Sequence, residues 1–270
     1  MASPEQPRDH NGPQPSRFEL PSVFTWVVLV GFLAFFIQGI TAVDVEGARL
    51  IAGIGNMGDF ISRAVPPDLS RLGPISGYML ETLNMAIVGV AFGVILSVPL
   101  ALLSSRNTTP HPVVRVVARG VTAVLRTVPE LIWALIFVAA VGLGPLAGIL
   151  AIIMDTIGFC ARFFAERIEE IRAGPSEAIQ STGGGRGAVI FGAILPEAMP
   201  SMTATSLFGV EKAIRSAVIL GLVGAGGIGV ELSSAMSLFR YDVALTIIMV
   251  IVAVVVVVET VSSAIRRRIM

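Results

Sequence analysis

The chain has very few of the residues from which metal centres and hydrolytic sites are built. Among 270 residues it has one cysteine, Cys160, and two histidines, His10 and His111. A single cysteine excludes an intrachain disulfide and a cysteine metal cluster, and two isolated histidines are too few for a histidine metal site. Both histidines fall in segments expected to be flexible or surface loops, so a Ser-His-acid set is not indicated. We predict neither a metal site nor catalytic residues.

Lysine and phosphate-binding loops are equally scarce. Lys212 is the only lysine, and it belongs to no G-x-x-x-x-G-K-[ST] motif. The chain therefore cannot hydrolyse ATP by the usual P-loop route, and by itself it is predicted not to be an enzyme. The formal net charge is zero, so the sequence carries no overall basic signature for nucleic acid.

Charged residues are too few for a soluble protein of this length. They make up 14% of the chain, against 54% hydrophobic residues and a mean hydropathy of +0.83. A soluble domain carries about a quarter charged residues. Several apolar runs are long enough to cross about 30 Å of hydrocarbon as helices. The sequence therefore predicts an all-α, polytopic membrane protein in contact with lipid.

Six segments fit membrane-spanning helices. Residues 1–20 contain four prolines and are expected to form a disordered cytoplasmic tail. The apolar stretch after them is too long for a signal-peptide core, so we predict a retained span there. Residues 21–270 form the transmembrane domain, with an external loop at 43–77, where we expect a short interfacial segment, and a cytoplasmic loop at 166–200. The predicted spans are Val23–Ala42, Tyr78–Leu103, Thr127–Val141, Pro145–Phe164, Ser201–Leu222 and Val243–Ser262.

The distribution of arginines sets the predicted orientation. With the N-terminus inside, thirteen arginines fall in cytoplasmic segments and four in external ones. This excess agrees with the positive-inside rule, so we expect both termini in the cytoplasm. The four external arginines are Arg49, Arg63, Arg71 and Arg240.

A glycine cluster follows the fifth predicted span. Residues 224–229 read Gly-Ala-Gly-Gly-Ile-Gly and literally satisfy the dinucleotide-binding pattern G-x-G-x-x-G. That pattern works only between a strand and a helix of a βαβ unit, which this sequence does not indicate. We instead predict a close-packed helix break near the outer face, where glycine lets backbones approach. Its candidate gate residues are Gly224, Gly226, Gly227 and Gly229.

A polar stretch between the fourth and fifth spans combines helix start and stop signals. Pro175 suits a first helical turn, and Glu177 suits the positive end of a helix. Residues 176–182 are therefore predicted to form a short helix, which the glycines from Gly183 stop. Leu195-Pro196 then marks re-entry toward the membrane. A short exposed helix between two spans is something a partner could push on; the alternative is an ordinary solvated loop.

The spacing of this stretch resembles the EAA loop of ABC-importer permeases, whose pattern is E-A-A, three residues, G, nine residues, I, one residue, L-P. The chain departs from the pattern at two positions, with Ile179 for the third motif residue and Ala193 for the isoleucine. The resemblance implies that the stretch docks onto a separate ATPase. The implied coupling residues are Ser176, Glu177, Ala178, Gly183, Leu195 and Pro196.

A longer, ordered set of segments resembles the phosphonate-importer permease family over roughly residues 65–265. The segments are Glu81–Ala86, Pro99–Ala101, Arg126–Ala134, Gly142–Pro145, Glu166–Glu170, and Glu211–Arg215 leading into Val223–Gly229. The resemblance implies a type I ABC-importer permease fold in a bacterial plasma (inner) membrane. It also implies uptake of phosphonates, or of phosphate or phosphite, by alternating access.

The same resemblance implies partners and leaves alternatives open. The implied partners are a second copy of the chain, two ATP-binding cassette subunits that bind ATP and Mg, and an extracytoplasmic phosphonate-binding protein; no cofactor belongs to this chain. One alternative is a permease for another small solute, such as methionine. Another is a secondary transporter without an ATPase partner. A membrane enzyme is a third class, for which no convincing nucleophile, base or metal set is present.

Polar residues inside the predicted spans are candidates for the translocation path, because intramembrane charges are costly and commonly functional. Glu211 and Arg215 are spaced i, i+4, so we predict a salt bridge between them. It would serve helix packing, or Arg215 would offer its planar fork to a phosphonate oxyanion in transit. Arg126 and Glu130 repeat this spacing in reverse order, with a structural or interfacial role expected. The other candidates, each more simply explained by helix packing, are Glu81, Asn84 and Trp133.

Overall fold

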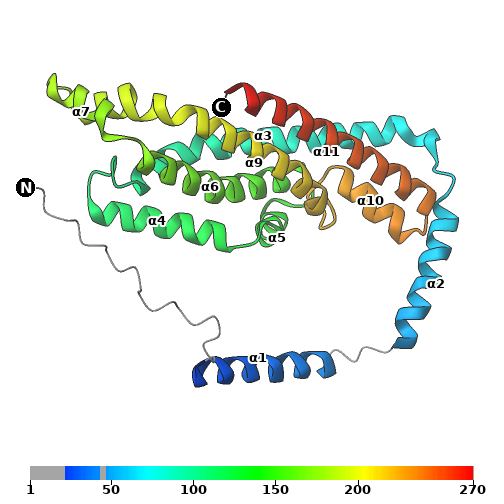
Figure 1. Cartoon of the computed structure of the whole chain (residues 1–270). Helices are drawn as coiled ribbons and strands as arrows, with labels where there is room; N and C mark the ends of the chain where they lie inside the picture. Colours follow the sequence, from blue (N-terminus) through cyan, green and yellow to red (C-terminus); the bar gives the residue numbers. More distant parts are fainter. Residues whose placement is uncertain (1–21, 43–46, 270) are drawn as a thin grey trace, which may run out of the picture. The chain divides into compact units, whose positions relative to one another are not determined.

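The structure, a computed structural model, describes residues 22–42 and 47–269, and every regular element in those residues is a helix. This confirms the all-α prediction for that part of the chain; the predicted tail at 1–20 lies outside it. In chain order the elements are α1 (Val23–Ala42), α2 (Gly47–Ala64), η1 (Leu69–Arg71), α3 (Leu72–Ser104), α4 (Pro112–Thr127), α5 (Glu130–Val141), α6 (Pro145–Glu170), α7 (Ala173–Ser181), α8 (Arg186–Val189), the π-helical turn η2 (Ile190–Ile194), α9 (Leu195–Gly221), α10 (Ile228–Ser237) and α11 (Tyr241–Ile269) (Figure 1).

The chain divides into two compact units, residues 1–58 and residues 59–270, and the division falls inside α2. In the first unit, α1 has the same bounds as the first predicted span. Its residues are predominantly apolar, and none of them is buried within this chain. A helix of this length and composition suits direct contact with lipid.

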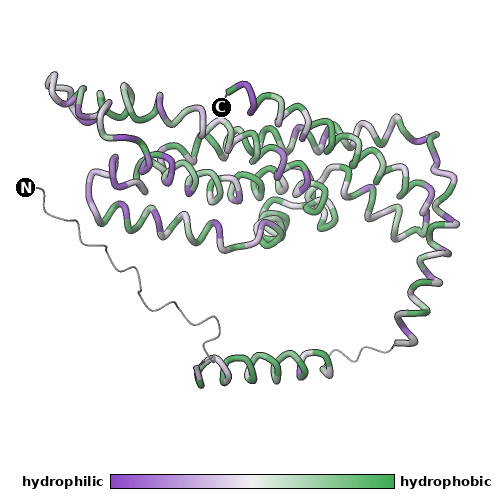
Figure 2. The backbone as a smooth tube through the Cα atoms, viewed as in Figure 1, coloured by the Kyte–Doolittle hydropathy of each residue, from purple (hydrophilic) through white to green (hydrophobic). Residues whose placement is uncertain are grey.

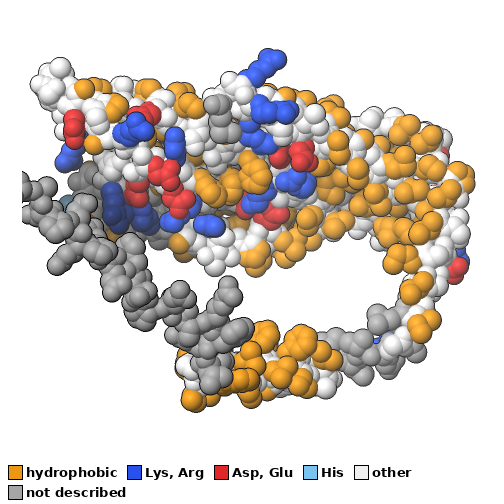
Figure 3. All heavy atoms as spheres, in the orientation of Figure 1, with side chains coloured by type: hydrophobic (Ala, Val, Ile, Leu, Met, Phe, Trp, Pro, Cys, Tyr) orange, Lys and Arg blue, Asp and Glu red, His pale blue; other side chains and the backbone are white. Residues whose placement is uncertain are grey.

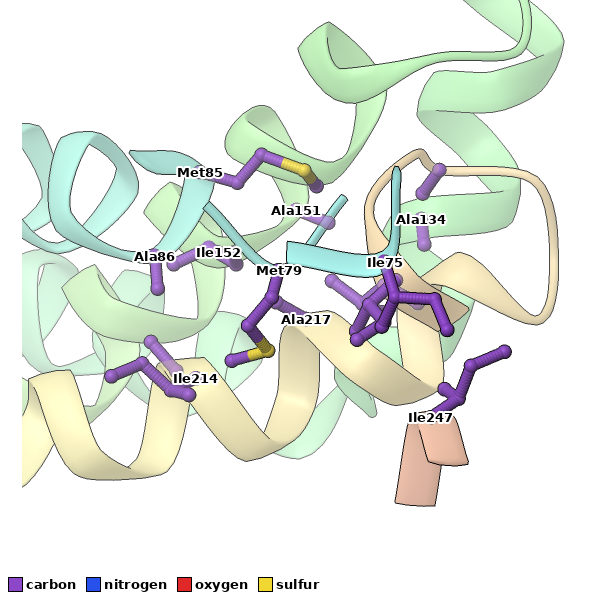
Figure 4. Packing of buried hydrophobic residues seen from close by; sticks show 14 of the residues in the cluster. Ile75, Met79, Met85, Ala86, Ala134, Ala151, Ile152, Ile214, Ala217 and Ile247 are labelled. Atoms are coloured by element: carbon purple, nitrogen blue, oxygen red, sulfur yellow. The ribbon is translucent and has the colours of Figure 1, made fainter. Parts of the chain in front are cut away.

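The second unit is a helical bundle whose core lies among α3, α6, α9 and α11. Buried side chains from these helices and from α5 converge there, as Figure 4 shows. Glycines bring α3 close to α6: a Cβ on Gly89 would lie 2.6 Å from Ile152, and one on Gly93 would lie 2.5 Å from Thr156. Two small residues four positions apart allow this approach. The close contact adds van der Waals attraction between the helices, which matters in a membrane because the hydrophobic effect does not drive helices together there.

Five helical segments are long and apolar enough to cross a membrane: α1, residues 69–104, α6, residues 186–221 and α11. Together, α4 and α5 pass the same test as a sixth, although the two helices meet at an angle of 88°. Figure 2 shows apolar residues along these helices, with hydrophilic positions recurring along α4 and around α7. The prediction of six spans thus holds for five helical segments, and the remaining span is a broken pair.

The third predicted span, Thr127–Val141, is wrong in its starting point. Helix α4 ends at Thr127, and α5 begins at Glu130 after the extended residues Val128 and Pro129. Proline lacks an N–H and restricts the residue before it, which explains the break. Helix α5 has 12 residues, about 18 Å of rise, which is too short for the hydrocarbon core. No span is predicted over the preceding helix α4, because its arginines lower the hydropathy.

The external loop predicted at 43–77 contains helix. Helix α2, η1 and the first turns of α3 fall within its described part. The break predicted at the two prolines is confirmed, because α2 ends at Ala64. The Asp68 carboxylate then caps η1, and hydrogen bonds from the Ser70 hydroxyl and N–H lower the pKa of Asp68. The described part of this segment thus contains an 18-residue helix followed by a capped turn, and its place at a membrane interface stays a prediction.

The loop predicted at 166–200 is also mostly helical. Helix α6 continues to Glu170, and a single helical path runs from Arg186 to Gly221 through α8, η2 and α9. Leu195-Pro196 therefore lies inside a helical path that begins at Arg186, nine residues before the predicted point of re-entry. The π-helical turn η2 directly precedes Pro196 and widens the backbone, so a residue without an N–H is tolerated there.

Candidate functional site

Helix α7 is a short helix between two candidate spans, and it presents its motif residues outward. Glu177 and Ala178 are exposed, whereas Ser176 and Ile179 are half-buried. The Ile179 side chain packs against a buried cluster that contains Phe164, Ile168, Val189 and Ile194. The departure from the EAA pattern at Ile179 thus falls on the side that holds α7 to the bundle. The exposed face keeps the matching residues.

The C-terminal end of α7 is fixed by two glycines. Gly183 has a φ of +83°, a left-handed conformation that favours glycine. The Gly184 N–H donates to the Ile179 carbonyl at 3.0 Å, and the Gly183 N–H donates to the Gln180 carbonyl at 2.9 Å. This pair of hydrogen bonds is a Schellman motif. The prediction of a short helix stopped at Gly183 is confirmed, with the helix beginning three residues earlier than expected.

The last turn of α6, just before α7, is joined to α4 through Glu169. The Glu169 Oε1 atom accepts hydrogen bonds from Arg119 at 2.8 Å, from Arg115 at 3.4 Å and from the Arg106 N–H at 2.7 Å. The Asn107 side chain also donates to the Ile168 carbonyl at 2.9 Å. Movement of α7 would therefore pull on α4 and on the segment that follows α3. Sequence reasoning missed Glu169 as a connector, because its partners lie at least 50 residues away.

The predicted Glu211–Arg215 salt bridge is wrong. Glu211 is buried and accepts from Arg266 of α11 at 2.6 Å, whereas the Arg215 side chain is exposed. Arg266 also donates to Ser262 and Ser263 on its own helix. Glu211 pairs with α11 and Arg215 is left exposed, so tertiary packing overrides the favourable spacing along one helix. The partner is 55 positions distant, beyond any local pattern.

Two further findings concern charges in the candidate spans. Arg126 and Glu130 lie on different helices across the 88° bend, so the helical spacing predicted for them does not apply. Lys212 instead binds Asp155 of α6, with its Nζ 2.8 and 2.7 Å from the two carboxylate oxygens. The same Nζ lies 5.3 Å from the centre of the Phe159 ring. In the sequence, the one signal that could have indicated this pair is Asp155, an isolated aspartate in the apolar run after Pro145.

The glycine cluster is a close-packed break between α9 and α10, as predicted. Gly224, Gly226 and Gly227 have φ values of +85°, +88° and +75°. A Cβ on Gly229 would lie 2.0 Å from the Val218 carbonyl oxygen, so the backbones touch. A dinucleotide site has no support, because the described residues include no strand to precede the cluster.

Glu81 is brought to this glycine cluster by packing. Its carboxylate accepts from the Gly227 N–H at 2.9 Å, and the neighbouring Thr82 hydroxyl accepts from the Ile228 N–H at 2.8 Å. Both residues therefore cap the N-terminal end of α10, which exposes unpaired N–H groups. The helix-packing role that the sequence allowed for Glu81 is what these contacts show.

Asn84 and Trp133 stand apart from these contacts. Asn84 is exposed on α3, while Trp133 is half-buried, packs against the main core and stacks on Phe137 with ring centres 6.2 Å apart. The Trp133 Nε1 atom is buried without a hydrogen-bond partner in the described chain. Neither residue shares a hydrogen bond or ion pair with another path candidate among the residues described. Figure 3 shows charged side chains over the half of the bundle that carries α4 and α7, while the half toward α10 is mainly hydrophobic.

This architecture defines a multi-pass, all-helical membrane protein with an exposed helix held between two spans. The chain belongs to the family of binding-protein-dependent transport system inner membrane components, whose model matches residues 89–270. Membership of this family identifies the chain as a membrane component of a transport system.

Individual relatives and a solved structure agree with this placement. The chain is 41% identical over 226 residues to the phosphate-import permease protein PhnE of Mycolicibacterium smegmatis, covering 84% of this chain but only 42% of that protein. It is 37% identical over 222 residues to the phosphite transport system permease protein PtxC of Stutzerimonas stutzeri, covering 82% and 81%. In fold it is similar to a chain of the inward-facing MetNI methionine ABC transporter, with a TM-score of 0.63, 20% identity, and coverage of 73% and 96%. The fold is that of a type I ABC-importer permease.

Proposed function

We propose that this chain is the permease subunit of an ATP-driven importer that moves phosphonates, or the related oxyanions phosphate and phosphite, into the cell. The observation that carries the proposal is the 41% and 37% identity, over more than four fifths of this chain, to relatives named for phosphate import and phosphite transport. The exposed helix α7 supports the proposal that a partner protein supplies the energy for transport. This chain has no P-loop lysine of its own.

The proposed coupling runs from α7 into the bundle. Two ATP-binding cassette subunits, with their ATP and Mg, dock on the exposed face of α7 at Glu177 and Ala178. ATP binding moves α7, and Glu169 passes this displacement to α4 through Arg115 and Arg119. The rigid Schellman end at Gly183 keeps α7 from unwinding under load. Alternating access then follows as a population shift between global states that the ATPases bias.

The proposed path lies between two copies of this chain. Arg215 is an exposed cation on a spanning helix, and Asn84 is an exposed amide on another; a second copy would bring such groups to face each other. The glycine break, held by Glu81 at Gly227, is proposed as the gate. An extracytoplasmic phosphonate-binding protein delivers the substrate. A second, different permease chain in the purified complex would replace the homodimer by a heterodimer.

The proposed orientation places α7 and both termini in the cytoplasm of a bacterium. A cysteine-labelling experiment tests this, because the only native cysteine, Cys160, is fully buried. In a Cys160→Ala background, Gln180→Cys on α7 and Arg240→Cys after α10 are both exposed positions. We expect a membrane-impermeant maleimide to label Arg240→Cys in intact cells and Gln180→Cys only after the membrane is opened. The reverse pattern contradicts the orientation.

The function is tested by purifying the chain from its host and measuring what accompanies it. We expect an ATP-binding cassette subunit to copurify, which a secondary transporter would not require. The cognate binding protein is then titrated with alkylphosphonates, phosphite, phosphate and methionine. Tight binding of a phosphorus oxyanion supports the proposal. A preference for methionine without any response to phosphorus compounds overturns the substrate assignment.

A further inference from the structure

A cavity of about 350 Å³ lies between the end of α3, α4 and the second half of α6. Its polar lining consists of Ser104, Arg119, Thr122, Arg126, Thr127, Arg162 and Glu166, and three alanines supply the rest. This cavity is separate from the exposed face of α7 and from the glycine break.

Positive charge is in excess in the cavity. Three arginines line it against one glutamate, and Glu166 is already paired with Arg162 at 2.5 Å. Arg119 is held by Glu169 at 2.8 Å and by the Ser104 carbonyl at 3.0 Å. The side chain of Arg126 has no hydrogen bond or ion pair within the described residues. One guanidinium is therefore free to bind a ligand, and the others are fixed beside it.

A buried hydroxyl at the same cavity lacks a partner. The Ser104 side chain is 2% exposed, and its Oγ atom makes no hydrogen bond within the described part of the chain. Buried hydroxyl groups almost always find a partner, because an unpaired one loses its hydration without replacement. Its main-chain carbonyl is occupied by Arg115 and Arg119, so the side chain alone is left over. A hydroxyl donor and a free guanidinium that line the same cavity point to an oxygen-rich anion.

We propose that this cavity binds a phosphate-type oxyanion, with Arg126 supplying a planar, charged fork and Ser104 a hydroxyl hydrogen bond. Guanidinium groups match such oxyanions by paired hydrogen bonds, and these are the strong, geometrically specific kind. The anion is either a free phosphorus oxyanion or the headgroup of an anionic lipid, since both offer the same oxygens. If the bound anion is the transported substrate, that identification rests on the proposed function. The proposal that the cavity binds an oxyanion does not rest on it.

The position of Arg119 connects the cavity to the coupling segment. Its guanidinium lines the cavity and also binds Glu169, which lies two residues before Ile171 and four before α7 begins. An anion near Arg119 would compete with Glu169 for that guanidinium. Occupation of the cavity is thus placed to change how α6 and α4 are held together.

The test uses the purified complex of the full chain with its ATPase partners in lipid nanodiscs, without the binding protein. Inorganic phosphate and methylphosphonate are titrated by calorimetry, and retention of phosphatidic acid and phosphatidylglycerol is followed by native mass spectrometry. Arg126→Gln is expected to weaken the bound species about tenfold. Ser104→Ala is expected to weaken it several-fold while leaving the melting temperature of the empty complex unchanged or raised. Arg240→Gln, an exposed arginine far along the chain, is the matched control and should bind like the parent.

The outcomes separate the sources of the anion and the two proposals. Phosphate or methylphosphonate binding that Arg126→Gln weakens supports the cavity as a site for free oxyanion. Lipid retention that the same variant abolishes supports it as a headgroup site. Absence of both, or equal binding by Arg126→Gln and Arg240→Gln, overturns the cavity proposal. Because uptake with the binding protein is measured separately, normal oxyanion uptake in that last case leaves the proposed function standing.

Discussion

Glu169 accepts a hydrogen bond from Arg119 at 2.8 Å, and this contact joins the end of α6 to the middle of α4. Because α7 begins four residues after Glu169, this carboxylate is one point at which a force on α7 reaches the bundle, beside the packing of Ile179 against the buried cluster. Arg115 and the Arg106 N–H converge on the same oxygen, so the joint has three donors. The hydrogen bonds of this joint are charge-assisted and therefore strong. Their side chains are half-exposed, so the joint lies outside the buried core.

Glu169→Gln is predicted to uncouple transport from ATP hydrolysis. The neutral amide weakens three charge-assisted hydrogen bonds, each of which contributes about 1.5–3 kcal/mol when made by a charged group. Uptake by reconstituted complexes should fall about tenfold or more, while ATPase activity persists. Glu170→Gln is the control, since the Glu170 side chain makes an exposed ion pair with Arg167 and no other among the residues described. Equal uptake by both variants would show that the Glu169 joint carries no coupling.

Gly183→Ala is predicted to damage the end of α7. An alanine at a φ of +83° costs about 1–2 kcal/mol and loosens the two hydrogen bonds of the Schellman motif. Gly185→Ala is the matched control, because Gly185 has a φ of −73° and nothing lies within 4 Å of a Cβ added there. We expect reduced uptake and less copurified ATPase for the first variant alone. Matching losses in both variants would point to general damage to the loop.

Arg266→Gln is predicted to destabilise the bundle, whereas Arg215→Gln is not. Removal of Arg266 leaves the buried carboxylate of Glu211 without its charged partner. Loss of one partner of a buried pair costs about 3–5 kcal/mol, and the partial exposure of Arg266 lowers the expectation to about 2 kcal/mol. Thermal unfolding of the purified complex measures the difference. A larger loss of thermal stability for Arg215→Gln than for Arg266→Gln would contradict the Glu211–Arg266 pair and favour the Glu211–Arg215 salt bridge that the helical spacing predicted.

Gly229→Ala is predicted to prevent assembly of the folded chain. Its Cβ would lie 2.0 Å from the Val218 carbonyl oxygen, and the other nearest atoms, of Gly221 and Val218, are backbone too, so no flexible side chain can move away. Gly77→Ala on α3 is the control, since nothing lies within 4 Å of a Cβ there. Size-exclusion profiles of detergent extracts should show a loss of monodisperse protein for Gly229→Ala only. A normal profile and melting temperature for that variant would refute the close packing of the break.

Local chemistry made the short helix predictable, and long-range packing set the limits of prediction. Pro175 and Gly183 act within a few residues, so the sequence located α7 and its end. The partner of Glu211 could not be predicted, because a helical spacing names Arg215 while the fold supplies Arg266 from the last helix. The pair of Lys212 with Asp155 was missed for the same reason. The arginines of α4 lower its hydropathy, so this helix, which packs along α6, was not included in the third predicted span. That span was therefore predicted to begin at Thr127, where α4 ends.

The most direct measurement is ATP-dependent uptake of radiolabelled phosphate and methylphosphonate, with ATPase activity recorded in the same proteoliposomes. The parent complex with its binding protein is compared with Glu177→Ala, a change on the exposed face of α7. We predict oxyanion uptake by the parent, and for the variant a loss of uptake with normal membrane insertion and ATPase activity no longer linked to transport. Normal, ATP-dependent uptake by Glu177→Ala would contradict the account of α7 as the helix through which a partner drives this permease.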